Sequence, residues 1–482
     1  NKYIYSTTIL VIGTSFCSTI IGVLCAFFVS FCKFPGRKFF EWSLILPLTI
    51  PTYIAAYSYY DILELFNPMM ILIRDNLGVQ AMSITNDILV YICIILILTS
   101  VLFPYVYLST RASFLSQGNK LIEAAKTLGH TPFSIFWKVI LPLSRPAIIA
   151  GLSLVIMETI NDYGAVEYFG IPTFTVGIFR SWLGMNDFDT ALKLSSYLLF
   201  FIFIFLFLEK KSRGNAKFDQ KNDSLMTHKY ITLKSYQEKL LILICSVPFL
   251  MGFIIPVSRL IIWSVSASPD FLDFQLIKII INSILLASFT SPIIVFLSIF
   301  LLFSTKYFQS HIVKLFNKLA ILGYSMPGAV IAMGMLLIFS KLNQLTNILI
   351  TGTIISLFFA YIVRFLAVAW QPIDSNLEKK CSDINEAARD MGNLPISTLF
   401  KLNLPLIQKS ILISFILVFI DIFKELPLTL ILRPFNFDTL ATITFDLNKQ
   451  AQIYEAAIPA LIIIMVTVFP IIVLNKKIEG KI

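Results

Sequence analysis

Long apolar runs separated by short polar stretches form the dominant pattern along this chain. A membrane-spanning helix needs about 20 predominantly apolar residues, and most of the runs are close to that length. Five runs precede residue 209 and six follow residue 238, at residues 6–31, 40–62, 88–108, 146–162, 192–208, 240–263, 279–303, 315–339, 348–366, 410–423 and 454–474. The pattern predicts an all-α, polytopic membrane protein with about 11 spans.

A charged, mainly basic stretch at residues 209–238 separates the two groups of runs. Basic loops between spans lie on the cytoplasmic side of the membrane. If the other loops alternate, these basic residues fall on that same side: Lys33, Arg37, Lys38, Arg111, Lys120, Lys126, Lys138 and Arg145. We therefore divide the chain into a first transmembrane domain (1–208), a cytoplasmic linker (209–238) and a second transmembrane domain (239–482).

The same topology places residue 1 outside the cell, which does not mirror a second half with six spans. The sequence also begins with Asn1 rather than with Met. We expect that the first half lacks a leading span in this sequence. The alternative is a natural arrangement of five spans followed by six.

One polar segment occurs twice at equivalent places in the two groups of runs. The sequence EAAKTLG at residues 123–129 returns as EAARDMG at residues 386–392, an offset of 263. We name them the first and second EAA segments. The offset continues through Pro132 and Pro395, Ser134 and Ser397, Lys138 and Lys401, Leu141 and Leu404, and Pro142 and Pro405. The halves are therefore predicted to be two parallel repeats of one helical bundle.

The residues of the first EAA segment predict a helix, a turn and a second helix. Residues 121–128 favour a short helix with one small face, and Gly129 supplies the left-handed residue that commonly ends a helix. Thr131 is a good cap for a second short helix whose first residue is Pro132. Such an element suits docking on another protein. The alternative, an amphipathic helix lying on the membrane surface, does not account for two copies in register.

Composition excludes several classes of function. The chain is 57% hydrophobic and 14% charged, which is typical of an integral membrane protein. Its net charge of +10 lies in loops between spans, so we expect no binding of nucleic acid. Six scattered cysteines and three distant histidines predict no metal site. No phosphate-binding GxxxxGK[ST] loop and no catalytic constellation occurs, so we expect a protein that is not itself an enzyme.

Both EAA segments resemble the EAA loop of binding-protein-dependent ABC permeases, which are type I importers. In that loop EAA is followed by three residues, Gly, nine residues, an apolar residue, any residue and Leu-Pro. Val139 and Leu402 stand at the apolar position. The resemblance implies a coupling helix seated in a cleft of an ATPase subunit. It assigns contact with one ATPase subunit to Glu123, Ala124, Ala125 and Gly129, and with another to Glu386, Ala387, Ala388 and Gly392.

Stretches at residues 33–38, 46–53, 157–164, 424–427 and 432–438 are similar to the fused ferric-iron permeases. This narrower resemblance implies iron transport through the inner (plasma) membrane, a periplasmic binding protein that docks on the outer loops, and surrounding membrane lipid. It also implies that ATP is bound by the partner subunits, with no cofactor in this chain. Import of thiamine, a polyamine or an oxyanion by the same kind of machine remains an alternative.

Four carboxylates near the ends of two spans are candidates for the substrate path. Glu158 and Asp421 are related by the offset of 263, and Asp162 and Glu425 follow four residues later, on the same helical face. Carboxylates in a span face the bundle interior or water, and oxygen ligands suit a hard cation. The alternative is that these residues lie at the membrane edge, solvated or ion-paired, with Lys424 beside Glu425.

An ion-coupled secondary transporter is a further hypothesis, because such proteins also contain internal repeats. Many of them use inverted repeats, whereas both EAA segments here are predicted to be cytoplasmic. The parallel repeat therefore favours the ABC permease.

Overall fold

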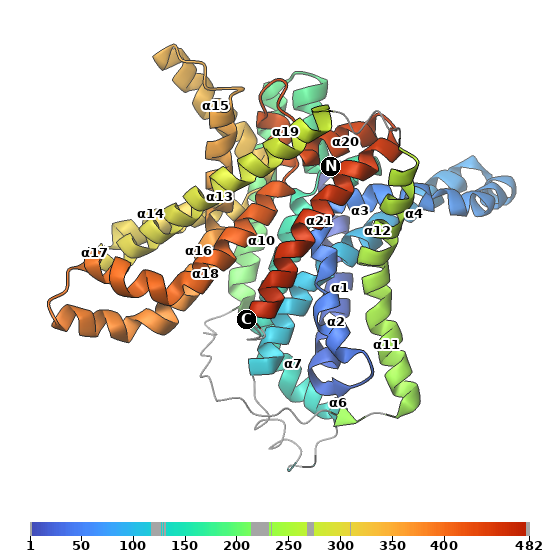
Figure 1. Cartoon of the computed structure of the whole chain (residues 1–482). Helices are drawn as coiled ribbons and strands as arrows, with labels where there is room; N and C mark the ends of the chain where they lie inside the picture. Colours follow the sequence, from blue (N-terminus) through green and yellow to red (C-terminus); the bar gives the residue numbers. More distant parts are fainter. Residues whose placement is uncertain are drawn as a thin grey trace. The chain divides into compact units, whose positions relative to one another are not determined.

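The computed structural model of the chain describes residues 2–116, 127, 129, 132–213, 231–232, 234–267, 274–308 and 310–478 (Figure 1). Nearly all of the described residues are helical. The first half contains α1 (Lys2–Phe31), α2 (Arg37–Ser43), η1 (Leu46–Thr49), α3 (Thr52–Ser58), η2 (Tyr60–Ile62), η3 (Glu64–Phe66), α4 (Asn67–Ser116), α6 (Pro132–Ile135), η4 (Phe136–Ile140), α7 (Leu141–Asn161), α8 (Gly164–Tyr168), α9 (Phe174–Phe179), η5 (Arg180–Gly184) and α10 (Phe188–Arg213).

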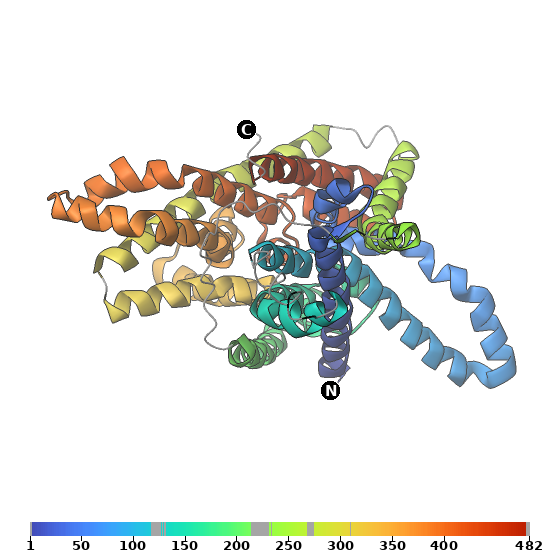
Figure 2. The same ribbon diagram turned by 90° about the horizontal axis from the view of Figure 1, so that it is seen from below.

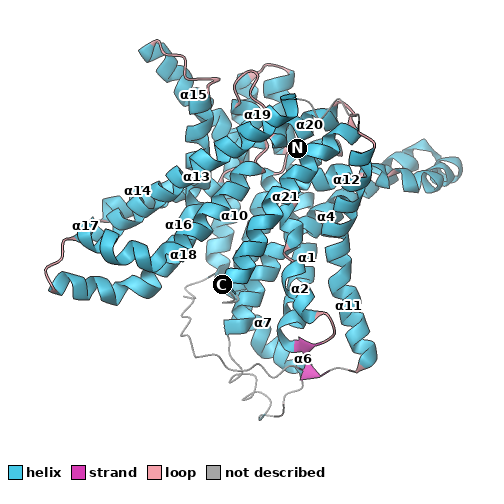
Figure 3. Cartoon of the chain, in the orientation of Figure 1, coloured by secondary structure: helices cyan, strands magenta, loops and turns pink. Residues whose placement is uncertain are grey.

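The second half follows with α11 (Ser235–Phe249), η6 (Leu250–Ile254), α12 (Ile255–Val265), α13 (Phe274–Phe308), α14 (His311–Ile321), η8 (Leu322–Ser325), α15 (Gly328–Thr346), α16 (Ile354–Asp390), α17 (Pro395–Thr398), η9 (Leu399–Asn403), α18 (Leu404–Phe423), α19 (Pro427–Leu432), α20 (Leu440–Lys449) and α21 (Ile453–Ile478). A parallel pair of two-residue strands, β1 (Cys32–Lys33) and β2 (Ile231–Thr232), is drawn in magenta in Figure 3.

The described part of the chain has ten helices long and apolar enough to cross a membrane, or 11 if one bent pair counts as a single span. The prediction of an all-α, polytopic membrane protein is confirmed. The bent pair is 37–49 with 52–58, which turns through 93°. It covers the predicted span 40–62, so that span is not one straight helix. Pro47 and Pro51 account for the interruption, because proline lacks the amide that would continue the helix.

The corresponding span of the second half is interrupted in the same way. The predicted run 315–339 is divided into α14, the 3-10 turn η8 and α15, with Pro327 immediately before α15. In the turn, a Cβ on Gly323 would lie 1.9 Å from the Val363 carbonyl oxygen of α16. The backbone of α16 therefore occupies the space that a side chain at residue 323 would need.

Each half is built around three mutually packed helices. They are α1, α4 and α7 in the first half, and α13, α16 and α18 in the second, where α16 and α18 lie side by side (Figures 1 and 2). In the first half Gly22 of α1 and Gly151 of α7 both approach the backbone of α4, near Val106. Small residues permit such close approach of helices in membranes.

Serines replace these two glycines in the second half. Ser298 donates a hydrogen bond to the Leu366 carbonyl of α16 at 3.2 Å, and Ser414 donates to the Ala369 carbonyl at 2.9 Å. Ser414 lies 263 residues after Gly151, which is the offset of the EAA segments. Ser298 lies 276 residues after Gly22, which is a larger offset. The repeat therefore has a second register, which relates the residues before α4 to those before α16. The first half has additional residues between its interrupted helix and the C-terminal part of α4.

The chain forms two compact units, residues 1–186 with 197–262, and residues 187–196 with 263–482. The helices α11 and η6, which follow the linker, thus pack with the first half. Tyr59 donates to the Met251 carbonyl at 2.5 Å, and a Cβ on Gly252 would lie 2.1 Å from the Ser100 carbonyl oxygen. The linker 209–238 separates the repeats in sequence, but the first compact unit extends through residue 262.

Candidate functional site

The second EAA segment lies at the C-terminal end of α16 rather than in a separate short helix. Gly392 follows in the left-handed conformation with φ of 75°, and the Asn393 amide donates to the Ala388 carbonyl at 3.0 Å. This bond and the left-handed glycine form a Schellman motif, the common end of a helix. Met391 and Leu394, on either side of the turn, are 73% and 74% exposed. The turn therefore presents apolar side chains outward.

The residues of the two segments are described unequally. Glu123, Ala124 and Ala125 lie outside the described residues, as do the side chains of Glu386 and Ala387. Gly129 has φ of 79°, as expected for the residue that ends a helix, and a Cβ there or on Gly392 would meet no described atom within 4 Å. Ala388 is completely buried within the chain, so its side chain packs against its own protein in this conformation. The role of these residues in coupling stays a prediction.

A long helix follows each glycine turn, so the prediction of a short second helix was wrong: the segment from Pro132 is continuous with the following span, and Thr131 lies outside the described residues. In the first half α6, η4 and α7 run without a break from Pro132 to Asn161, and α17, η9 and α18 do the same in the second half. Each has a π-helical turn at the same place, where the Leu141 amide bonds to Phe136 and the Leu404 amide to Leu399. The prolines of the Leu-Pro pairs explain this turn, because they cannot bond to the carbonyl four residues earlier.

The first of these long helices is followed directly by Asp162, a residue that is 6% exposed. Its Oδ1 accepts hydrogen bonds from the Ala165 and Val166 amides of α8, at 3.1 and 3.2 Å. Its Oδ2 accepts from the Thr52 hydroxyl. Thr52 is the first residue of α3, directly after the break at Pro51. Asp162 thus joins three elements: the end of α7, the start of α8 and the start of the interrupted helix.

Glu425 makes the equivalent contacts in the second half. Its Oε1 accepts from the Leu428 amide of α19 at 3.2 Å, and its Oε2 lies 3.2 Å from Nε of Arg364. Arg364 also donates to the Met326 carbonyl, which precedes Pro327, at 3.3 Å. Arg364 and Glu425 are both buried, with side chains 6% and 7% exposed. An ion pair of this kind is costly to break, because an uncompensated buried charge remains.

In each half, the residue that begins the helix after the proline break lies next to the buried carboxylate. Gly328 begins α15 after Pro327, as Thr52 begins α3 after Pro51. A Cβ on Gly328 would lie 2.7 Å from Oε1 of Glu425 and 2.9 Å from Nη1 of Arg364. The backbone at Gly328 therefore rests directly on the ion pair.

The other two candidate carboxylates lie one helical turn earlier and are less buried. Glu158 of α7 is half-buried. Asp421 of α18 forms an ion pair with Lys424 at 3.1 Å, with side chains 19% and 24% exposed. The structure thus places Glu158 near Asp162 and Asp421 near Glu425 along their helices. A role of these four residues in the substrate path is untested by these contacts.

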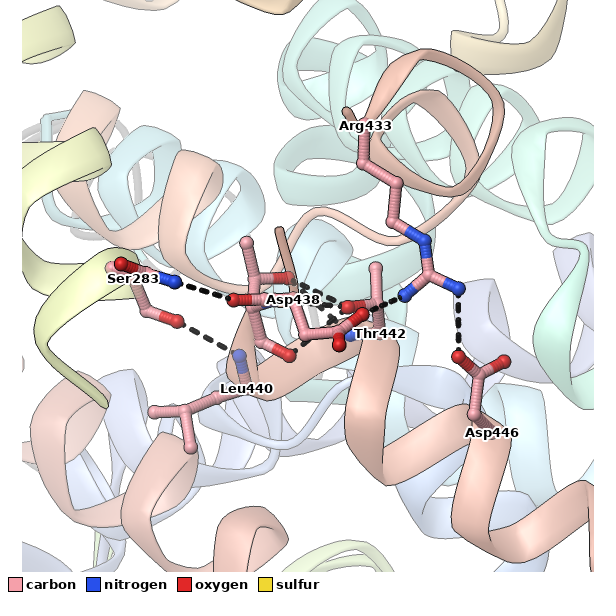
Figure 4. Close-up of polar contacts among 8 residues, drawn as sticks. Ser283, Arg433, Asp438, Leu440, Thr442 and Asp446 are labelled. Carbon is pink, nitrogen blue, oxygen red and sulfur yellow. Dashed lines mark hydrogen bonds and ion pairs between the residues drawn. The ribbon is translucent and has the colours of Figure 1, made fainter. Parts of the chain in front are cut away.

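The loop between α19 and α20 is held by a polar network (Figure 4). Arg433 bonds to Asp438 at 2.5 Å and to Asp446 at 2.8 Å. Thr439 accepts from the Thr442 amide to cap α20, and the Leu440 amide donates to Ser283 of α13 at 2.8 Å. The network fixes a turn whose side chain Phe435 is 93% exposed.

The start of this network is repeated in the first half. Thr173 caps α9 by accepting from the Val176 amide, and the Phe174 amide donates to Thr7 of α1 at 3.4 Å. Thr7 and Ser283 are related by the second register, which also relates Pro51 to Pro327. The repeat thus extends to the loops that follow both carboxylates.

The sequence is similar to known proteins, in part of the first half and along nearly the whole chain. Residues 18–213 match the family described as binding-protein-dependent transport system inner membrane component. Over 98% of its length, the chain is 26% identical to the Fe(3+)-transport system permease protein FbpB 2 of Haemophilus influenzae, 89% of which is covered. These matches confirm the recognition of the chain as a permease of the binding-protein-dependent ABC type. It is a multi-pass protein of the inner membrane and a transport subunit.

Shorter similarities connect the permease to relatives with other substrates. It is 28% identical to the sulfate transport system permease protein CysT of Escherichia coli, over 31% of the permease and 51% of that protein. It is 27% identical to the spermidine/putrescine transport system permease protein PotB of Haemophilus influenzae, over 43% of the permease and 73% of that protein. These similarities to binding-protein-dependent permeases favour the ABC permease over the hypothesis of an ion-coupled secondary transporter.

Sequence reasoning missed Thr52, Gly328 and Arg364, which contact the two buried carboxylates. The second register was present in the sequence, since Thr14-Ser15 returns as Thr290-Ser291 at the offset that separates Pro51 from Pro327. That register relates Thr52 to Gly328. The pairing of Arg364 with Glu425 had no sequence signal, because residue 101, its counterpart at the offset of 263, is Val.

Proposed function

We propose that the permease imports ferric iron, delivered by a periplasmic binding protein and driven by ATP that partner subunits hydrolyse. The observation that carries this proposal is the similarity to a ferric-iron permease along 98% of the chain, which includes both halves. The similarities to sulfate and polyamine permeases cover less than half of the chain. They support a shared type of transporter more than a shared substrate.

The glycine turns support docking of two ATPase subunits, one at Gly129 and one at Gly392. Both glycines have the left-handed conformation, and a Cβ on either would meet no described atom within 4 Å. At the second turn Met391 and Leu394 offer exposed apolar contacts, whereas Ala388 supports the helix from inside. ATP binds to the partner subunits in this proposal, because the sequence contains no GxxxxGK[ST] phosphate-binding loop, and we propose no cofactor in this chain.

The outer loops are the proposed docking surface for the binding protein. They include residues 163–190 and 426–451, the second of which contains the network around Arg433. A loop already held in one conformation loses less conformational entropy when a partner binds.

The proposed iron path includes Glu158, Asp162, Asp421 and Glu425. Glu158 and Asp421 are the better candidates for transient contact with the metal, because they are more exposed. Asp162 and Glu425 already accept hydrogen bonds from backbone amides. Ferric iron is a hard cation, for which carboxylate oxygen is a suitable ligand.

Uptake by a strain that lacks the permease tests the substrate. Radiolabelled ferric iron, sulfate, spermidine and thiamine are supplied separately, with and without the permease on a plasmid. We expect that only iron uptake depends on the permease. Unchanged iron uptake, with loss of one of the other solutes, would reject the iron proposal.

Purification tests the proposed motor. We expect that the permease retains an ATPase subunit in mild detergent and that reconstituted transport requires ATP. Transport that continues without any ATPase would reject an ATP-driven importer.

A further inference from the structure

The interrupted helix of each half is tied to a carboxylate at one end of a long helix. In the first half the tie is the hydrogen bond from Thr52 to Asp162. In the second half Arg364 connects Glu425 with the Met326 carbonyl, beside the break. The chemistry differs, but the elements that are joined are the same.

The other end of each long helix begins at a glycine turn of an EAA segment. The helix from Pro132 to Asn161 has a length of about 45 Å at 1.5 Å per residue. A continuous helix moves largely as one body, so a displacement at its start also displaces the carboxylate at its end. The interrupted helix follows only if a contact holds it there.

We propose that Thr52 and Arg364 are positioning residues for transport. Each holds the start of its interrupted helix, α3 or α15, on the carboxylate that terminates the helix leading from the EAA segment. Movement of that long helix is thereby passed to the interrupted helix. This inference rests on the proposed function, because it takes the EAA segments as the place where the motor acts.

The local backbone makes these contacts effective. After each break the first amides of the new helix bond back to the proline carbonyl, from Ile54 and Ala55 to Pro51 and from Val330 and Ile331 to Pro327. The start of α3 is therefore a closed turn that moves as a unit. The Thr52 hydroxyl fixes this turn to Asp162, and the close approach of Gly328 to Glu425 fixes the matching turn of α15.

Two matched sets of variants test the two contacts. In the first half, Thr52→Val removes the hydroxyl at nearly constant volume, whereas Thr52→Ser keeps it. Thr159→Val is the control for loss of a buried hydroxyl, because the Thr159 hydroxyl of α7 donates to the Val155 carbonyl of its own helix. In the second half, Gly328→Ala displaces the ion pair without changing charge, and Gly334→Ala adds the same methyl to α15 in open space.

The first readout is the amount of ferric iron transported per ATP hydrolysed, in proteoliposomes that contain the permease, its ATPase and its binding protein. Thr52→Val and Gly328→Ala are expected to lower this ratio about tenfold, the effect of one lost hydrogen bond to a charged group, with hydrolysis maintained. Thr52→Ser, Thr159→Val and Gly334→Ala should keep the wild-type ratio.

The second readout does not depend on the solute or the motor. Hydrogen exchange of the α3 amides in the purified permease should become about tenfold faster in Thr52→Val, and stay unchanged in Thr52→Ser and Thr159→Val. Equal exchange in Thr52→Val and Thr52→Ser would overturn the inference, as would an equal effect of Thr159→Val. A wild-type permease that transports no iron would reject the proposed substrate, and the exchange experiment would still decide on the contact.

Discussion

Arg259 of α12 donates a hydrogen bond to Asp61 at 2.7 Å and so joins the helix after the linker to the turn that follows α3. The two side chains are 27% and 42% exposed. Close by, Tyr59 bonds to the Met251 carbonyl. These contacts bring residues on both sides of the linker into one compact unit.

The ion pair itself should contribute modestly to stability. We predict a coupling energy of about 0.5–1 kcal/mol between Asp61→Asn and Arg259→Gln, since partly exposed pairs are screened by solvent. A double-mutant cycle of thermal unfolding in one detergent measures it, and the value should fall at high salt. Zero coupling at low salt would show that the pair does not hold α12.

Cys25 of α1 and Cys245 of α11 offer a covalent test of the same packing. Both are buried free thiols, and their side chains are close enough to interact. We predict that copper phenanthroline joins them in a disulfide. If a protease site is introduced into the linker, the two fragments should stay together on a denaturing gel after cleavage until a reductant is added.

Cys245→Ser is the control for this crosslink and should release the fragments without reductant. Fragments of the unchanged permease that separate after oxidation would contradict the packing of α11 on α1.

The conformation of Gly392 predicts different effects for two small substitutions. Gly392→Ala should weaken co-purification of the ATPase about fivefold, because a left-handed alanine costs about 1 kcal/mol. Gly392→Asn should stay near the wild type, since asparagine adopts this conformation more readily. Equal binding of the ATPase to both variants would show that the shape of the turn is unimportant.

Substitution of the more exposed carboxylates should lower iron uptake more than it lowers the stability of the fold. We predict that Glu158→Gln and Asp421→Asn lower iron uptake about tenfold or more while the permease stays in the membrane in normal amounts. Quantitative uptake, normalised to permease in the membrane, measures this effect. Normal uptake in the double variant would remove both residues from the proposed path.

Arg433 should control the order of the loop after α19. Arg433→Lys keeps the charge but loses the planar group that reaches both Asp438 and Asp446. We predict faster proteolysis between α19 and α20 and weaker capture of the binding protein, with unchanged ATP hydrolysis in its absence. Unchanged proteolysis would mean that the contacts with Ser283 are sufficient to hold the loop.

The apolar runs predicted most of the spanning helices, because about 20 apolar residues have few alternatives to a helix in a membrane. They failed at residues 40–62 and 315–339, where the helix bends at the break before Pro51 and is interrupted by a 3-10 turn before Pro327. Hydropathy measures how favourably a segment transfers into lipid, and it carries no information about the direction in which the helix axis runs. The prolines were visible, but not the neighbouring backbone that the turns pack against.

The glycine turns were predicted as well, since EAA followed by Gly and Leu-Pro is local and occurs twice. The contacts at Asp162 and Glu425 were not, although both carboxylates were candidates. Thr52 and Asp162 lie far apart in the sequence, and Arg364 lies on a different helix from the one that ends before Glu425. A helical periodicity relates only residues of one helix, so it could not indicate which donors the carboxylates meet.

By itself, the sequence determined the membrane class, the parallel repeat and the glycine turns, because each depends on composition or on residues close together in the chain. Only the tertiary structure decided that α11 packs with the first half and that Thr52 and Arg364 reach the two carboxylates. Those contacts depend on which helix faces lie together, and that is fixed by packing among distant segments.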